Sequence, residues 1–129
     1  MKFKIDTREK FHVITLQETA LAANMTAELE NCLLSFLQND VKNLLLSLKD
    51  IQNIDNAAAE SLVKIQQLFY EQDASIVICE LQSQVEKELD DNGLLELVNL
   101  TPTQSEAADI IQMEQIEREL MDGESEEFE

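Results

Sequence analysis

The sequence predicts a single α/β domain built on one mixed β-sheet. Near its start, two short segments with alternating apolar and polar residues flank a polar turn, a pattern typical of an antiparallel hairpin. Further along, short apolar runs alternate with longer segments in which apolar residues recur every three or four positions. Such alternation is typical of parallel strands joined by helices. The predicted order is β-β-α-β-α-β-α-β-α, and short right-handed connections would place helices over the sheet.

The hairpin is predicted from residues 3–6 and 11–16, which flank the polar turn at residues 7–10. A helix is expected to begin at Asn24 or Thr26. Its apolar positions form one stripe, which predicts the face that packs on the sheet. The stripe consists of Leu29, Cys32, Leu33, Phe36 and Leu37.

Residues 44–48 are almost continuously apolar and too few for a helix, so they predict a strand covered on both faces. Residues 75–79 and 97–100 predict two further parallel strands. A second helix is expected from about Asn56 to Gln72. Its predicted buried stripe is Ala58, Leu62, Ile65 and Phe69.

Two capping boxes predict where the last two helices begin. In each, a Ser or Thr stands three residues before a Glu, a spacing that lets the two side chains satisfy free amides of the first turn. The boxes are Ser83 with Glu86 and Thr103 with Glu106. Gly93 is a plausible left-handed stop for the first of these helices.

The last helix is predicted to reach Leu120 and to carry an apolar stripe. We expect that stripe to pack on the sheet, and the length beyond Ile111 leaves room for a homodimer contact. The stripe consists of Ala107, Ile110, Met113, Ile116 and Leu120.

The charge balance excludes several partners. The 129 residues contain 27 acids and 9 bases, a net charge of −18, with no basic cluster to displace the counterions of nucleic acid. An anionic membrane would repel such a chain, and the longest apolar run, residues 76–79, is far too short to insert. We expect one domain over residues 1–121 and a disordered acidic tail at 122–129.

The cysteines and the first residues predict a cytoplasmic location. The first residues are mixed and charged, without the apolar core of a signal peptide. Cys32 and Cys79 form no closely spaced pair, and each lies in an apolar stretch. Both are therefore expected to be buried thiols in a reducing compartment.

No catalytic constellation is recognisable. His12 is the only histidine, and we expect it at a half-exposed position within a strand. Gly93 and Gly123 are the only glycines, so no glycine-rich loop can cradle a nucleotide. The sequence therefore predicts no catalytic residue, no metal site and no cofactor.

The informative segment, residues 51–62, joins a predicted strand to the second helix. Binding sites of open α/β sheets form at this edge, beyond the carboxyl ends of the strands. Asp55 or Asn56 can cap the helix, and the residues from Ala57 to Ala59 then leave its first-turn amides without side-chain cover. The segment is either an ordinary capped helix start or a close-approach surface for a protein or an anion.

The order of elements and this segment resemble the STAS domain, the fold of bacterial anti-sigma-factor antagonists. The family pattern "vvLdls … iDSSGlg.L" is similar to residues 44–48 followed by 54–62. Later similarities lie at residues 75–79, 82–89, 92–95 and 101–107. The resemblance covers most of residues 3–112 and implies a protein-binding regulator without catalytic activity.

The departures from the family pattern concern its phosphorylation switch. The family's Asp falls on Asp55, but its phosphorylatable Ser falls on Ala57 and the following Gly on Ala58. The family's "GELD" falls on residues 19–22, so its Asp is missing there. Alanine cannot receive phosphate, so we expect this chain not to be switched at that position. Ser61, one helical turn on, is a weak substitute because its neighbours suggest packing.

The resemblance implies an anti-sigma factor or another serine-kinase-like protein as the partner. An alternative keeps the fold but makes the chain a structural subunit of a larger complex, such as a transporter ATPase assembly. A third reading, of another class, is a binder of a small apolar ligand or an anion, which would need a large apolar pocket. The expected partner-binding residues are Asn24, Asp55, Asn56, Ala57, Ala58 and Glu60.

Overall fold

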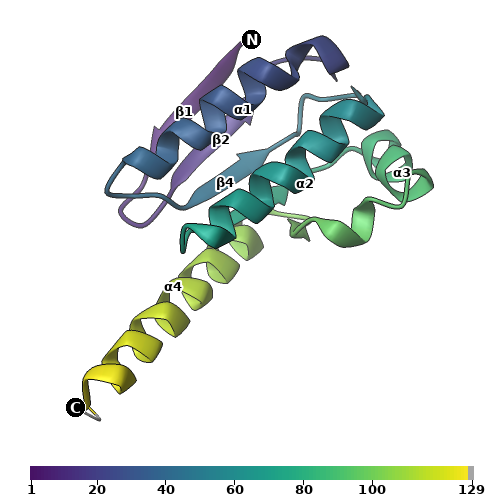
Figure 1. Ribbon diagram of the computed structural model, residues 1–129. Helices are drawn as coiled ribbons and strands as arrows, with labels where there is room; N and C mark the ends of the chain where they lie inside the picture. Colours follow the sequence, from purple (N-terminus) through teal and green to yellow (C-terminus); the bar gives the residue numbers. More distant parts are fainter. Residues whose placement is uncertain (128–129) are drawn as a thin grey trace.

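A five-stranded mixed sheet forms the centre of the molecule (Figure 1). The computed structural model describes the backbone of residues 1–127 and the side chains of residues 1–121. The strand order is β1-β2-β4-β6-β7, with β1 antiparallel to β2 and the other neighbours parallel, which confirms the predicted sheet. The strands are β1 (Phe3–Thr7), β2 (His12–Leu16), β4 (Leu44–Ser47), β6 (Ile76–Cys79) and β7 (Leu100–Thr101).

The N-terminal hairpin is confirmed, but its histidine is not half-exposed. Thr7 pairs with His12, and the turn is closed by a hydrogen bond from the Arg8 amide to the Phe11 carbonyl. His12 is buried because the chain after the first helix covers it. Its Nδ1 lies 3.1 Å from the Thr7 hydroxyl, its Nε2 lies 3.1 Å from the Val41 carbonyl, and its ring contacts that of Phe36.

Three helices cover one face of the sheet (Figure 1). They are α1 (Thr26–Leu34), which continues as the 3₁₀ turn η2 (Ser35–Gln38), α2 (Asn56–Glu71) and α3 (Ser83–Asp91). Alternate strand residues pack against them, as the period of two in a strand requires. All four predicted stripe residues of α2 are buried. Of the stripe predicted for the first helix, Leu29, Leu33 and Phe36 are buried, whereas Cys32 and Leu37 are partly buried.

One helix, α4 (Gln104–Glu127), covers the opposite face. Its buried contacts come from Ala107 and Ile111, which pack against Val13, Leu45 and Val77. The predicted stripe was wrong beyond Ile110, because Met113, Ile116 and Leu120 are exposed. The physical reason is the helical period: each step of three residues falls about 60° short of a full turn, so successive steps rotate the stripe away from the sheet.

The predicted domain boundary at residue 121 falls inside α4. The backbone remains helical through Glu127, where the sequence predicts a disordered tail from residue 122. The division into a domain at residues 1–121 and a disordered tail at 122–129 stays a prediction. The last two residues of the predicted tail, 128–129, lie outside the described residues.

Of four further local expectations, two were wrong and two were confirmed. The third parallel strand is the short β7, because Leu97 belongs to the 3₁₀ turn η3 (Leu95–Leu97). Ser83 is the first residue of α3, follows Gln82 at the cap position, and supplies no capping bond. Thr103 does cap α4, since its hydroxyl accepts a hydrogen bond from the Glu106 amide. Gly93 is left-handed just after α3, as expected.

The side-chain amide of Asn43 joins four parts of the fold. Its Oδ1 accepts hydrogen bonds from the Ser75 amide (2.9 Å) and from the Arg118 guanidinium (3.2 Å). Its Nδ2 donates to the Lys10 carbonyl (3.2 Å) and to Oε1 of Gln115 (2.7 Å). Asn43 is buried, so these contacts replace water that cannot reach the amide.

Replacing this amide is expected to destabilise the whole domain. Asn43→Ala leaves the buried Ser75 amide without an acceptor and frees Arg118, so we expect a loss of roughly 3 kcal/mol in the free energy of unfolding. Urea denaturation measures this loss. Asn39→Ala, at an exposed position nearby, is the matched control. A loss below about 1 kcal/mol would show that the amide is not the junction described.

Candidate functional site

A second, two-stranded sheet brings two distant segments together at the carboxyl edge of the main sheet. It consists of β3 (Ala20–Leu21) and β5 (Asn53–Ile54), paired in parallel. The Asp55 amide continues the pairing by donating to the Leu21 carbonyl at 2.8 Å. These strands are too short to be recognised from a sequence pattern. They place the turn before α1 next to the start of α2.

Asp55 stabilises this junction instead of capping α2. Its backbone is extended, as in an N-cap residue, but its side chain makes no hydrogen bond to α2. Oδ2 instead accepts a hydrogen bond at 3.2 Å from the amide of Ala23, in the 3₁₀ turn η1 (Ala23–Met25). Asn56, the other expected cap, is the first residue of α2, and its side chain donates to Glu60. The expected side-chain cap was therefore wrong.

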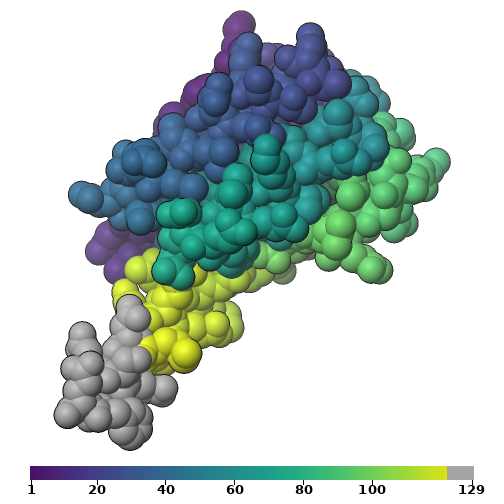
Figure 2. Space-filling model, in the orientation of Figure 1, coloured from purple at the N-terminus to yellow at the C-terminus, as the bar shows by residue number. Residues whose placement is uncertain are grey.

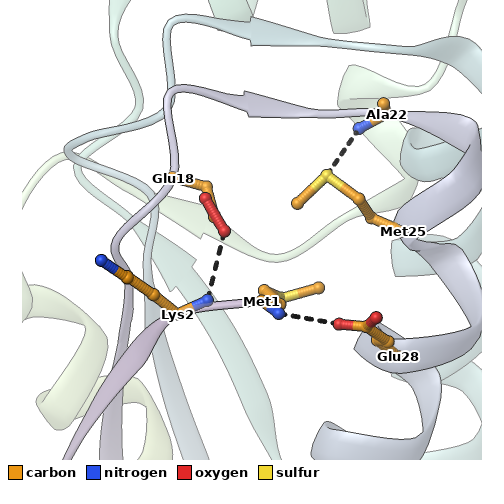
Figure 3. A network of polar contacts seen from close by, with 6 residues as sticks. All are labelled: Met1, Lys2, Glu18, Ala22, Met25 and Glu28. Atoms are coloured by element: carbon orange, nitrogen blue, oxygen red, sulfur yellow. Dashed lines mark hydrogen bonds and ion pairs between the residues drawn. The ribbon is translucent and has the colours of Figure 1, made fainter.

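Polar contacts lie within the η1 turn and between the beginning of the chain and α1 (Figure 3). The Met25 sulfur accepts a hydrogen bond from the Ala22 amide at 3.4 Å. Nearby, the amino group of Met1 forms an ion pair with Glu28 of α1 at 2.8 Å. The first bond closes η1 around Asn24, and the ion pair joins the beginning of the chain to α1, the helix that follows η1.

The structure brings five of the six expected partner-binding residues to the surface around this junction. All five are exposed, and we call them the α2 entry surface: Asn24, Asp55, Asn56, Ala57 and Glu60. The sixth expectation was wrong. Ala58 is 1% exposed and packs in the core beneath α2, so it cannot contact a partner. Helical geometry explains this, since Ala58 begins the buried stripe of α2.

Ser61 lies on the buried side of α2. It is 6% exposed, and its hydroxyl donates to Oε1 of Glu30 at 2.9 Å. Glu30 also forms an ion pair with Lys64 at 3.6 Å. A hydroxyl that is covered and already hydrogen-bonded is a poor acceptor for a phosphoryl group.

A polar cluster at the same edge of the sheet was not predicted. Glu80 directly follows β6 with a left-handed backbone (φ 62°). Its carboxylate accepts hydrogen bonds from the Ser47 hydroxyl and the Gln104 amide, both at 2.8 Å. Its position after a central strand was the available signal, since this is where sheet-edge sites form.

The electrostatics of the cluster stabilise a carboxylate beside a neutral thiol. Partial burial acts to raise the pKa of Glu80, but the hydrogen bonds from Gln104 and Ser47 and the charge of Lys49 outweigh it and lower this pKa. Burial and the neighbouring Glu80 charge raise the pKa of the Cys79 thiol to about 12. A protonated, buried thiol is unsuited to act as a nucleophile.

Within the part of the chain that the structure describes, no group of three or more His, Cys, Asp or Glu is arranged to hold a metal ion. Five surface hollows among the same residues have volumes of about 290–450 Å³. Each contains a charged side chain in its lining, so none is the large apolar pocket that a carrier of apolar ligands would use.

The chain is an α/β protein whose mixed sheet has three helices on one face and one on the other. Comparison with protein families shows which family has this fold. The model of the STAS domain matches residues 2–107, and the chain therefore belongs to the STAS domain family. A comparison with curated proteins finds no match. Among the described residues, no helix combines the length and the apolar character needed to cross a membrane.

Solved structures of low sequence identity share the fold. A putative anti-sigma factor antagonist from Thermotoga maritima is 20% identical, with a TM-score of 0.71 over 85% of this chain and 94% of that chain. The Bacillus anti-sigma factor antagonist SpoIIAA, in its unphosphorylated form, is 14% identical, with a TM-score of 0.67 over 86% and 96%. The murine Solute Carrier 26 family member A9 anion transporter is 15% identical, with a TM-score of 0.67 over 81% of this chain and 18% of that chain.

The lowered pKa of Glu80 predicts a stability that depends on pH. A carboxyl whose pKa is lower when folded contributes stability fully above its unfolded pKa, and this contribution is lost as the pH falls through the folded pKa. Glu80→Gln should therefore reduce the free energy of unfolding near neutral pH, by less than about 1 kcal/mol because solvent screens the exposed side of the carboxylate. Urea melts of both proteins between pH 7 and pH 3 should converge at the acidic end. A difference that persists or widens there would contradict the assignment.

Proposed function

We propose that this chain is a non-catalytic, cytoplasmic regulator that binds a protein partner through the α2 entry surface. The observation that carries the proposal is the exposed junction of η1 with the start of α2, held by the bond from the Ala23 amide to Asp55. A surface made of two segments locked by short strands is preorganised, which lowers the entropic cost of docking.

The family and its fold relatives support the proposed class of partner. Anti-sigma factor antagonists are among the solved structures that share this fold, and SpoIIAA is described in phosphorylated and unphosphorylated forms. These likenesses support an anti-sigma factor or a serine-kinase-like protein as the partner. Asp55 and Glu60 make the α2 entry surface acidic, so the docking face of the partner is expected to carry basic residues.

The proposed binding is not switched by phosphorylation at the family position. Ala57 occupies that position by resemblance, and its exposed methyl group offers no hydroxyl. A phosphate there would add a charge of about −1.5 to −2 and obstruct close approach of the partner. Because no phosphate can be added at residue 57, the chain stays in a state equivalent to the unphosphorylated form of a family member.

A second candidate function is that of a fixed subunit in a larger assembly, such as one containing a transporter ATPase. The observation that favours it is the likeness to the murine anion transporter, in which the matched region is 18% of a much longer chain. A subunit held permanently in place needs no switch, which agrees with alanine at residue 57.

The first proposal predicts that a negative charge at residue 57 weakens binding. Ala57→Asp should lower the affinity for the kinase-type anti-sigma factor recovered by tagged pull-down from the source cells, by about tenfold or more, because the new charge is desolvated without a partner. Calorimetric titration measures the change. Ala57→Asn, which matches the size without the charge, is the control and should bind nearly as the parent does.

Two results would contradict this first function. One is equal affinity of the Asp and Asn variants for the recovered partner. The other is recovery of a transporter ATPase or another fixed assembly without any such kinase, which would favour the second candidate.

The burial of Ser61 predicts that it is not a substitute phosphorylation site. Incubation of the protein with the recovered kinase and ATP should leave the intact mass unchanged, because the hydroxyl is covered and donates to Glu30. Ser61→Ala should leave partner affinity unchanged and cost about 1 kcal/mol of stability from the lost hydrogen bond. Stoichiometric phosphate at Ser61 in protein isolated from cells would overturn this prediction.

A further inference from the structure

Between Met113 and Leu120, α4 carries an apolar stripe on the side that faces away from the sheet. Met113, Ile116 and Leu120 are 60%, 53% and 61% exposed, and we call them the α4 outer stripe. Figure 2 shows this part of the helix (yellow) projecting from the body of the molecule. Large apolar side chains at three consecutive turns of one helix face mark an interaction surface more strongly than scattered ones do.

The outward orientation of the stripe is fixed by polar contacts on the opposite side of α4. The Arg118 guanidinium donates to the Ser75 hydroxyl (3.1 Å) and to Asn43 (3.2 Å). Gln115 accepts a hydrogen bond from Asn43 at 2.7 Å. One turn earlier, Glu114 accepts from the Tyr70 hydroxyl, which burial keeps protonated by raising its pKa. Rotating the helix to bury the stripe would break all of these bonds.

Charge decides what can cover the stripe. Between residues 104 and 121, α4 contains five acids and one base, Arg118, which is turned toward the body. Glu117 and Glu119 flank the stripe on its two sides, as their helical spacing requires. The α4 helix of a second copy would place the same carboxylates opposite them, in a chain whose net charge is already −18. Repulsion between these carboxylates disfavours such a dimer. A partner helix with lysine or arginine opposite Glu117 and Glu119 is attracted instead.

A hollow of about 290 Å³ lies beside the stripe and extends the surface to the hairpin turn. It is lined by Ile116, Gln112, Gln115 and Glu119 of α4 and by Glu9 and Lys10 of the turn between β1 and β2. A groove beside an exposed apolar helix face is a common receptor for a second helix, whose anchor side chains enter it.

We propose that the α4 outer stripe and this hollow bind an amphipathic helix of another protein, whose apolar face is flanked by lysine or arginine. This surface is separate from the α2 entry surface. Arg118 reaches Asn43 and Ser75 at the amino ends of β4 and β6, whereas Asp55 lies at the carboxyl edge of the sheet. The chain can therefore hold two protein segments at once, one at each edge of its sheet.

The test uses the full chain and synthetic helical peptides labelled with a fluorophore. One peptide carries a leucine and isoleucine stripe flanked by lysines; a second has the same composition in scrambled order; a third replaces the lysines with glutamates. Fluorescence anisotropy at physiological salt should show binding of the first peptide only. Ile116→Ser combined with Leu120→Ser should weaken it roughly 30-fold, since two apolar side chains lose their burial.

Matched variants separate the stripe from general attraction by the acidic chain. Leu97→Ser, which removes another exposed leucine outside α4, should leave binding unchanged. Glu117→Lys combined with Glu119→Lys should reduce the preference for the lysine peptide over the glutamate peptide. Ala57→Asp should bind the lysine peptide normally, so this test is independent of the function proposed for the α2 entry surface.

Three outcomes would overturn the proposal. The first is binding of the scrambled peptide as tight as that of the amphipathic one, and the second is binding by the serine variants equal to that of the parent. The third is a dimer, seen by sedimentation, that the same serine substitutions dissociate, because a second copy would then occupy the stripe.

Discussion

The side-chain amide of Asn43, at the amino edge of the sheet, satisfies hydrogen-bonding groups from the hairpin turn, β6 and α4 at the same time. Each of these elements packs by apolar contact, which is strong but has little directional preference. The amide adds direction, because its two donors and its acceptor lone pairs admit one arrangement of neighbours. The register of the central strands at this edge and the orientation of α4 both depend on it.

The contacts at the two edges of the sheet therefore stabilise different parts of the molecule. At the amino edge, Asn43 and Arg118 hold α4 so that its sheet-facing residues are buried and its other side is offered to solvent. At the carboxyl edge, the pairing of β3 with β5 and the bond from the Ala23 amide to Asp55 hold two loops together, and Asn24, Asp55 and Ala57 stay exposed there. A rigid edge that stays open to solvent is well suited to protein recognition.

The regular elements followed from the sequence because their signals are local. All four residues of the stripe predicted for α2 are buried, and the run at residues 44–48 predicted a central strand. The site was predicted less completely. Asp55, Asn56 and Ala57 were recognised from their position after that strand. Ala58 was expected both in the buried stripe of α2 and on the binding surface, and only the first expectation was right, because the helical period turns this side chain toward the core. Glu80 was missed because nothing around it in the chain indicates its partners Ser47 and Gln104.

The sequence by itself determined the fold class, the order of the longer strands and helices and the absence of a hydroxyl at residue 57, since each depends on residue type and short-range spacing. The tertiary structure alone decided which carboxylates stabilise loops, where Asn24 lies relative to Asp55, and which side of α4 meets the sheet. These outcomes depend on contacts between residues about 30 or more positions apart, as between Ala23 and Asp55 or Asn43 and Arg118. Such pairings leave no periodic trace in the chain, because the geometry that selects them exists only after the sheet has formed.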